Sequence, residues 1–376
     1  MAKQPRKPPR PGSSRRRRRG CGCAVLLLVL ALAAGGLGAY GWWLSRPYQG
    51  YAGAEKLVDV APGTGAARIL RQLRDEGVLA DDLVPRAWLV YVLHDPPLQA
   101  GQYRFAGPAT FPDVLRKLIR GDVVSRAVTV VPGFSLEDIA DQLARAGAGR
   151  REAFLERMRS PAPIADLDPA ATDLEGYLFP ETYRFALGTP EAEVVAAMVR
   201  MFRSRFERSV RPLMAGGTAS VREVVTLASI VEKEARAEGE RPVIAGVYHN
   251  RLMRRMGLDA DPTVIFALRR LGRWDGTIHH DDLRVDSPYN TYRYAGLPPG
   301  PICSAGLPSL EAAARPADVP YLYFVSRNDG THVFAATLEE QNRNVDIWQR
   351  RYWRERRRQQ RDAGGGEPGP HQGPPR

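Results

Sequence analysis

The sequence predicts an α+β fold with a single N-terminal transmembrane helix, a small α+β module and a larger mixed α/β domain. Three observations support this prediction: an uncharged run over residues 21–44, a strand–turn–helix pattern that occurs twice at an offset of 70 residues, and amphipathic helices interspersed with short strands over residues 126–352. The chain has 376 residues, which is enough for two or three domains with cores of their own.

The positive charge of the chain is concentrated at its start. Of a net charge of +12, nine positive charges lie in residues 1–20, and no acidic residue precedes Glu55, so the remainder of the chain carries only +3. A basic segment directly before an apolar helix usually keeps the N-terminus in the cytoplasm. We therefore expect residues 1–20 to be a cytoplasmic tail that sets topology and contacts anionic membrane lipid, and we expect no nucleic-acid partner.

Residues 21–44 are expected to form the transmembrane helix. At about 1.5 Å per residue they reach roughly 36 Å, more than the roughly 30 Å of a hydrocarbon core, and Tyr40, Trp42 and Trp43 supply aromatic side chains for the far interface. A signal peptide cleaved at residues 52–54 is the alternative. The length of the run and the polar linker that follows it (45–54) favour an uncleaved, single-pass anchor in the cytoplasmic (inner) membrane, with all later residues outside the cytoplasm.

The repeated pattern marks the module that follows the linker. Val58 to Gly77 matches Val128 to Gly147, and each copy reads as a short alternating strand, a Pro-Gly turn and a helix that ends at glycine. Such a unit resembles half of a LysM-type glycan-binding module. Residues 111–120 add another amphipathic helix, so we expect a LysM-like glycan-binding module over residues 55–125.

The second copy of the repeat opens a larger domain, expected over residues 126–352. Its predicted helices are 135–146, 190–205, 221–237, 242–254 and 337–350, and its predicted strands are 128–131 and 321–325. The aromatic, proline-broken segment 176–185 is expected to form the wall of a groove. Residues 353–376 are too polar to bury a core and are expected to be a disordered tail.

An apolar helical run, Leu227 to Ala235, carries two glutamates. Val224, Leu227, Ala228, Val231 and Ala235 form one apolar stripe at helical spacing, and Glu232 and Glu234 fall on its two opposite borders. The periodicity does not choose between the two, and a solvated charged face is the simpler interpretation of either. A carboxyl at the edge of an apolar surface has a raised pKa, however, and can act as a proton donor near neutral pH.

Polar and aromatic residues downstream could bind a ligand. Asn290, Thr291 and Tyr292 offer the hydrogen bonds and aromatic faces that hold sugars. The Asp261-Pro262-Thr263 segment predicts a helix N-terminus in which Asp261 is the cap and proline takes the first position. That interpretation is compatible with these residues lining a site.

Several motifs in order resemble one family, the endolytic murein transglycosylases (MltG or YceG-like proteins). They are LEGYLFPETY (174–183), LASIVEKEA (227–235), HNRL (249–252), DPTVIFAL (261–268), SPYNTY (287–292), GLPPGPI (296–302) and PYLYFV (320–325). The resemblance covers roughly Val58 to Arg350 and includes the single N-terminal anchor. Several long motifs in a consistent order are far more specific than one short pattern.

The resemblance implies cleavage of peptidoglycan glycan strands between N-acetylmuramic acid and N-acetylglucosamine, with 1,6-anhydro-muramyl ends and no cofactor. The essential glutamate of the family is the second of the VEKE pair, which is Glu234 here. We further expect Asn290, Thr291, Tyr292, Asp261, Thr263 and Glu181 to contact the substrate. Strand termination in this family implies peptidoglycan synthases as neighbours.

Three alternatives stay open from the sequence. The chain is a membrane-anchored glycan-binding scaffold without catalysis, or it is a hydrolase that pairs Glu234 with Asp261 or Glu181. A metal site at His279 to Asp282 is the third, although adjacent ligands rarely converge on one ion, and we expect no metal. The three cysteines give neither a disulfide framework nor zinc-ligand spacing, and Cys303 is expected to be a buried, unreactive thiol.

Overall fold

The computed structural model describes residues 19–44 and 46–363, and the chain divides into two compact units between Val124 and Ser125. Most of the predicted cytoplasmic tail (1–20) and the last residues of the predicted disordered tail (364–376) lie outside the described residues. Each unit is described by itself.

The first unit begins with an apolar helix, α1 (Arg19–Leu44). Its segment Val25–Trp42 is long and apolar enough to cross a membrane, and none of that segment is buried against protein. A signal sequence would pass the same test of length and composition.

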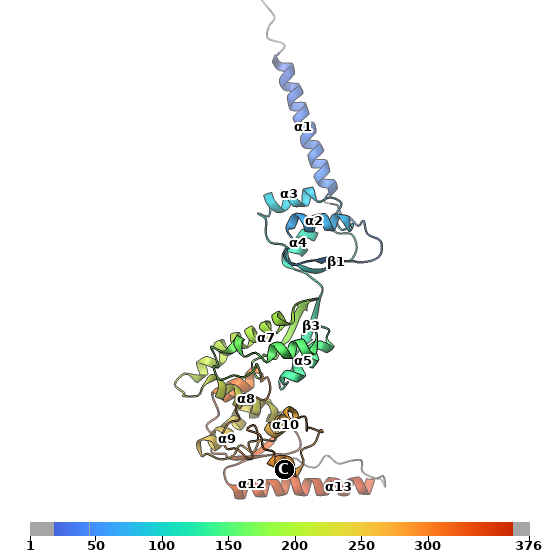
Figure 1. Ribbon diagram of the computed structural model, residues 1–376. Coiled ribbons are helices and arrows are strands. Elements are labelled where there is room, and N and C mark those ends of the chain that lie inside the picture. Colours follow the sequence, from blue (N-terminus) through green and yellow to red (C-terminus); the bar gives the residue numbers. More distant parts are fainter. Residues whose placement is uncertain (1–18, 45, 364–376) are drawn as a thin grey trace, which may run out of the picture. The chain divides into compact units, whose positions relative to one another are not determined.

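The rest of the first unit is a strand pair with three helices (Figure 1). In chain order it contains β1 (Lys56–Val60), α2 (Ala66–Asp75), α3 (Leu83–Tyr91), β2 (Gly101–Phe105) and α4 (Phe111–Arg120). β1 and β2 pair antiparallel, with Val58 opposite Tyr103. Both of these side chains are buried in one core with the apolar faces of the three helices.

The sequence repeat corresponds to a structural repeat. β1 and α2 form the first copy, and β3 (Ser125–Thr129) and α5 (Leu136–Arg145) form the second. Gly77 and Gly147 follow the helices with φ of 76° and 68°, a left-handed conformation that glycine adopts readily. In each copy the next backbone N–H bonds back to a leucine carbonyl, at 2.8 Å for Leu73 and 3.0 Å for Leu143, and this closes the helix end. The predicted repeat is confirmed.

The second unit is mainly helical, with two antiparallel strand pairs among its described residues. Besides β3 and α5, its α-helices and strands are α6 (Arg151–Met158), β4 (Thr182–Ala186), α7 (Glu191–Arg205), α8 (Val221–Glu234), α9 (Arg241–Met253), α10 (Asp261–Arg270), α11 (Leu307–Ala314), β5 (Tyr323–Ser326), β6 (His332–Ala335), α12 (Leu338–Val345) and α13 (Tyr352–Ala363). Short 3-10 turns are η1 (Ala162–Ile164), η3 (Arg211–Met214), η4 (Glu238–Glu240) and η5 (His280–Arg284), and π-helical turns are η2 (Phe206–Val210) and η6 (Asp346–Arg351). β3 pairs with β4, and β5 pairs with β6.

The five predicted helices of this unit are confirmed, with one difference of detail, and two other predictions for this part of the chain are wrong. Helix α8 ends at Glu234, where Ala235 turns to an extended conformation, rather than at residue 237. The tail expected to be disordered from residue 353 is helical to Ala363, because its arginines, glutamines and glutamate favour a helix that needs no buried face. Segment 176–185 is no groove wall, since Tyr177 and Leu178 are fully buried in the core.

Helix α8 lies in the middle of the second unit and packs against α9, α10 and α11. Ser220 and Glu223 form a capping box at its start. Residues 224–231 are all buried, so the helix has almost no solvated face before its last turn. Gly176 packs closely between Pro301 and Val225 of this helix. A Cβ on Gly176 would lie 2.5 Å from Pro301 and 3.0 Å from Val225, so only glycine fits at this position.

Two glycine substitutions separate backbone strain from close packing. Gly176 and Gly188 have nearly the same φ, +82° and +79°, but a Cβ on Gly188 would have no neighbour within 4 Å. We expect Gly188→Ala to lower the free energy of unfolding by about 1 kcal/mol, and Gly176→Ala to lower it by about 1–3 kcal/mol more because the methyl overpacks the core. Urea denaturation of both variants measures the difference, and equal losses would contradict the packing at Pro301.

Candidate active site

The second unit contains a cavity of about 1130 Å³ into which the end of α8 faces. Glu234 lines it, together with Tyr248 and Arg251 from α9. Its other walls come from residues 258–261, Tyr292, the β5–β6 hairpin and the C-terminal helices α12 to α13. The cavity is slightly larger than the roughly 300–1,000 Å³ that is usual for small-ligand sites, which suits an extended ligand.

The two glutamates of the apolar helix occupy different environments. The Glu232 carboxylate accepts hydrogen bonds from the Gly306 N–H at 3.0 Å and the Ser309 hydroxyl at 2.7 Å, at the start of α11. It also pairs with Arg241 at 3.5 Å, and its side chain is only 8% exposed. A carboxylate interacts favourably with the positive N-terminal end of a helix. Glu232 therefore stabilises the packing of α11 against α8, and its carboxylate oxygens are already hydrogen-bonded.

Glu234 instead faces the cavity and has one hydrogen-bond partner among the described residues. The Tyr248 hydroxyl donates to its Oε1 at 3.2 Å, which leaves Oε2 able to carry a proton. Desolvation by the surrounding protein and, to a lesser extent, the nearby charge of Asp261 raise the pKa of Glu234, while the hydrogen bond from Tyr248 and the charge of Arg251 lower it; the net result is a pKa of about 7. Its place at the C-terminal, negative end of α8 disfavours ionisation in the same sense.

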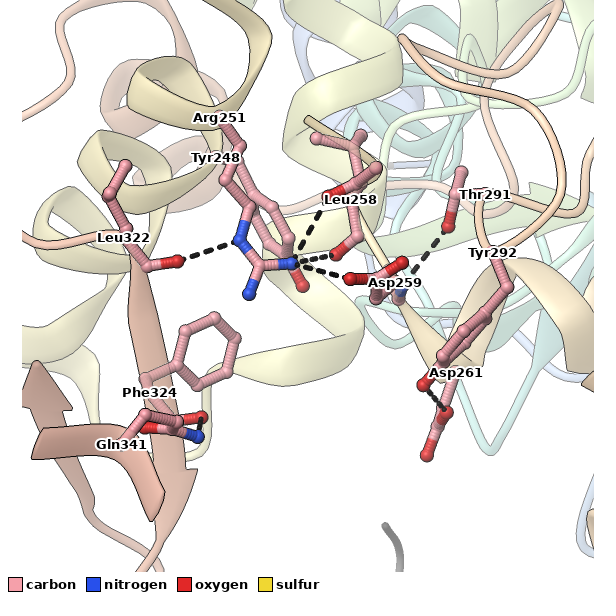
Figure 2. Close-up of polar contacts among 12 residues, drawn as sticks. Tyr248, Arg251, Leu258, Asp259, Asp261, Thr291, Tyr292, Leu322, Phe324 and Gln341 are labelled. Carbon is pink, nitrogen blue, oxygen red and sulfur yellow. Dashed lines mark hydrogen bonds and ion pairs between the residues drawn. The ribbon is translucent and has the colours of Figure 1, made fainter. Parts of the chain in front are cut away.

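Arg251 lines the same cavity as Glu234, and its guanidinium connects several segments of the chain (Figure 2). Its Nε donates to the Leu322 carbonyl at 2.7 Å, and its Nη1 donates to the carbonyls of Gly257 at 3.2 Å and Leu258 at 2.8 Å. It also pairs with Asp259 at 3.3 Å. The guanidinium therefore ties α9 to the residue before β5 and to the loop before α10.

Asp261 and Tyr292 form a second polar pair in the cavity. The Tyr292 hydroxyl donates to the Asp261 carboxylate at 2.6 Å, as Figure 2 shows. Burial raises the pKa of Asp261. Helix α10 does begin here as predicted, but its N-cap is Ala260, so Asp261 is no cap: its side chain bonds Tyr292 instead.

Asn290, Thr291 and Thr263 are fully buried behind this pair. The Asn290 amide donates to the carbonyls of Leu283 and Val285 and accepts from the N–H of Tyr292. The Thr263 and Thr291 hydroxyls lie 2.9 Å apart, and Thr291 accepts from the N–H of Ala260. These side chains hold Tyr292 and Asp261 in place, and the structure leaves them no surface for a sugar.

Glu181 is not brought to the cavity. It lies directly before β4, pairs with Arg205 at 3.3 Å and accepts from the Thr182 N–H. The expected contact of Glu181 with substrate therefore has no support in the geometry. Cys303 is buried, its thiol donates to the Ser229 carbonyl, and burial raises its pKa well above the usual value, as expected of an unreactive thiol.

The segment proposed as an alternative metal site has local partners. His279 pairs with Asp275 at 2.9 Å, and its N–H bonds the Asp282 carboxylate. Within the described residues, no group of three or more His, Cys, Asp and Glu side chains could hold a metal ion.

Tyr248 and Arg251 line the cavity although no role was predicted for either from the sequence. Both lie three residues apart on α9, within or beside the HNRL motif, and that spacing places them on one helix face. The signal was therefore present, but nothing in the sequence indicated that this face meets the end of α8.

Comparisons with known proteins agree on one family. The model of the YceG-like family matches residues 58–347. A Bacillus subtilis protein named endolytic murein transglycosylase is 32% identical over 82% of this chain and 89% of that relative. A Streptococcus pneumoniae protein of the same name is 27% identical over 77% of this chain, which spans 57% of that relative. The crystal structure of a YceG-like protein from Listeria monocytogenes has a TM-score of 0.53 and 31% identity, covering 77% of this chain and 98% of that one.

The raised pKa of Glu234 has a consequence for stability. Because the pKa is raised from 4.5 in the unfolded chain to about 7 in the folded one, the folded state binds the proton more tightly. Stability from this group is therefore present below about pH 4.5 and is lost as the pH rises through 7. Glu234→Gln removes the cost of ionising this carboxyl in the folded protein. The free energy of unfolding of the variant, relative to that of the parent, should therefore rise by on the order of 1–3 kcal/mol between pH 5 and pH 8.5. Thermal unfolding at both pH values measures this, and a constant difference would contradict the assigned pKa.

Proposed function

Because the chain belongs to the YceG-like family, we propose that it is a lytic transglycosylase that cleaves within the glycan strands of peptidoglycan. The observation that carries the proposal is the Glu234 carboxyl, which lines the cavity with a pKa of about 7. A group with a pKa near the working pH can both donate and accept a proton efficiently. A glycan-binding scaffold without catalysis would not need such a group.

In the first step, Glu234 protonates the oxygen that bridges N-acetylmuramic acid to the next N-acetylglucosamine. The C1–O bond breaks, the bonding electrons leave with the oxygen, and the departing sugar carries the proton as a hydroxyl. Positive charge develops on the muramyl ring, while Glu234 becomes a carboxylate. The substrate's own acetamido group can share that charge.

In the second step, the Glu234 carboxylate removes the proton from the muramyl 6-hydroxyl, and the oxygen attacks C1. The ring closes to a 1,6-anhydro end, no water is consumed, and Glu234 regains its proton. One residue therefore serves as acid and then as base, whereas glycoside hydrolysis generally needs two carboxyls. General acid–base catalysis of this kind contributes on the order of 10²–10⁴ in rate.

The neighbours of Glu234 tune and place it. Burial favours the neutral acid before the first step, and the Tyr248 hydroxyl stabilises the carboxylate formed by that step. Burial raises the pKa of Tyr248 well above its usual value, so the hydroxyl stays a donor throughout. We assign Asp261 a role in balancing the positive charge of the sugar ring, because it lines the same cavity and already acts electrostatically on Glu234.

We further propose that α1 anchors the chain in the cytoplasmic membrane and that residues 55–125 bind glycan as a LysM-like module. The apolar α1 and the strand–helix–helix–strand order of β1, α2, α3 and β2 support these assignments. An anchored enzyme would act on strands close to the membrane, where peptidoglycan synthases are the expected neighbours.

A hydrolase that uses Glu234 with Asp261 is the second candidate. It is favoured by one observation, which is that both carboxyls line one cavity and interact electrostatically. The products distinguish the two reactions, because hydrolysis leaves reducing ends and transglycosylation leaves 1,6-anhydro ends.

Matched substitutions at the two helix glutamates test the catalytic assignment. Glu234→Gln keeps the shape and the acceptor for Tyr248 but cannot donate the proton, so we expect at least a 10²-fold loss of cleavage with an intact fold. Glu232→Gln should retain most activity and instead lose on the order of 1–3 kcal/mol of stability, because it weakens the bonds at the start of α11. Release of soluble fragments from purified peptidoglycan measures cleavage.

Mass spectrometry of those fragments tests the chemistry. We expect 1,6-anhydro-muramyl ends from internal positions of the strands. Reducing muramyl ends would support the hydrolase, and a Glu234→Gln variant with the parent's activity would remove Glu234 from the mechanism.

A further inference from the structure

The C-terminal helical segment gives the cavity a wall that the proposed chemistry does not use. Its cavity-lining side chains in η6 and α13 are Asp346, Gln349, Arg350, Trp353, Arg354 and Arg357. They recur at steps of three and four residues, as expected of a single helix face. One face of this arginine-rich segment, which carries three arginines, therefore lines the cavity that Glu234 also lines.

The arginines of this stripe, which we call the basic wall (Arg350, Arg354 and Arg357), are only lightly engaged. No hydrogen bond or ion pair of the Arg350 or Arg357 side chain occurs within the described part of the chain. Arg354 donates to the Arg350 carbonyl at 3.2 Å and reaches Asp346 at 3.9 Å. Arginines that point elsewhere are paired nearby, as Arg351 is with Asp346 at 2.7 Å and Arg343 is with Glu339 at 2.6 Å.

The basic wall is set apart from the reacting centre. Arg251 is the cation that lowers the pKa of Glu234, and the arginines of the wall have no part in that shift. They are exposed to solvent at the rim of the cavity. Cations in this position can attract an anionic part of a ligand without ionising the acid, which has to stay neutral before it donates its proton.

We propose that the basic wall is a subsite for the carboxylates of peptides carried by the glycan strand, so that the enzyme prefers peptide-bearing strands to bare glycan. This inference rests on the proposed function. The sugars of a peptidoglycan strand are neutral once the muramyl lactyl group is amidated, and the carboxylates of the strand lie on its stem peptides. Guanidinium groups bind carboxylates through paired, charge-assisted hydrogen bonds.

Trp353 completes the subsite. Trp353 follows Arg350 and precedes Arg354 on the same stripe and lines the cavity, while its Nε1 donates to Gln349 at 3.2 Å. The Tyr352 ring meets the indole edge-on with centroids 5.3 Å apart, and the Arg356 guanidinium lies 5.8 Å from the indole centroid. The part of the indole that lines the cavity is the surface we assign to the aliphatic part of a peptide. An apolar plane flanked by guanidinium groups matches short peptides that alternate alanyl methyl groups with carboxylates.

Binding to a catalytically inactive protein tests the subsite independently of cleavage. The ligands are soluble, uncross-linked glycan oligosaccharides with stem peptides, and the same oligosaccharides after an amidase has removed the peptides. The full-length Glu234→Gln protein in detergent is compared with Glu234→Gln that also carries Arg350→Gln and Arg357→Gln. The matched control adds Arg343→Gln, which removes an arginine from α12 outside the cavity.

We expect the double arginine variant to bind peptide-bearing oligosaccharides about three- to tenfold more weakly at low salt, the effect of two solvent-exposed ion pairs. Its affinity for bare oligosaccharides and the affinity of the Arg343→Gln control should not change. The loss should shrink at high ionic strength, because exposed charges are screened.

Two results would overturn the subsite: equal affinity of both proteins for peptide-bearing strands, or an equal loss on both ligands, which would indicate a structural role for the arginines. Displacement of the peptide-bearing ligand from the wall by inorganic pyrophosphate at equal charge, but not by free stem peptide, would also overturn it in favour of a phosphate site. This experiment measures binding and needs no cleavage. If the active protein failed to produce 1,6-anhydro ends, that would contradict the proposed function but would not change the measured affinities.

Discussion

The structure depends on one constraint: the Glu234 carboxyl has to be desolvated by the protein and still be accessible to a ligand in the cavity. Helix α8 meets both demands because residues 224–231 are buried on all sides and the helix stops at Glu234. Glu234, the last residue of the helix, is therefore desolvated by the surrounding protein and also faces the cavity. Two residues earlier, Glu232 is bound to the start of α11 and has no such freedom.

The surroundings of this carboxyl form two layers. Tyr248, Arg251, Asp261 and Tyr292 line the cavity, and the first three act electrostatically on Glu234. Behind them, buried hydroxyl and amide groups at 263, 290 and 291 satisfy one another and nearby backbone groups. Buried polar groups that are fully hydrogen-bonded make the surrounding structure rigid. The second layer therefore holds the side chains of the first layer in position. The basic wall lies on a third element and adds an electrostatic feature that neither layer supplies.

The sequence was sufficient for the periodic elements and insufficient for the contacts between them. The repeat at Val58 and Val128 and the five predicted helices of the second unit follow from spacing and turn chemistry, which are local, whereas α6, α11 and α13 were not predicted. The choice between Glu232 and Glu234 came from resemblance alone, because the partners that separate them, Gly306, Ser309 and Tyr248, are distant in sequence. Asn290 and Thr291 were expected to face a sugar for the same reason: polarity identifies groups that need partners, but only tertiary structure shows that backbone groups provide them.

The central claim is that the protein environment raises the pKa of Glu234 to about 7, so that a large share of the carboxyl is protonated near neutral pH. Its most direct test is a titration of the Glu234 carboxyl carbon by ¹³C NMR, in protein labelled at glutamate side chains and assigned with the Glu234→Gln variant. The account predicts a single inflection near pH 7. An inflection near pH 4.5, the ordinary value for a hydrated glutamate, would contradict it.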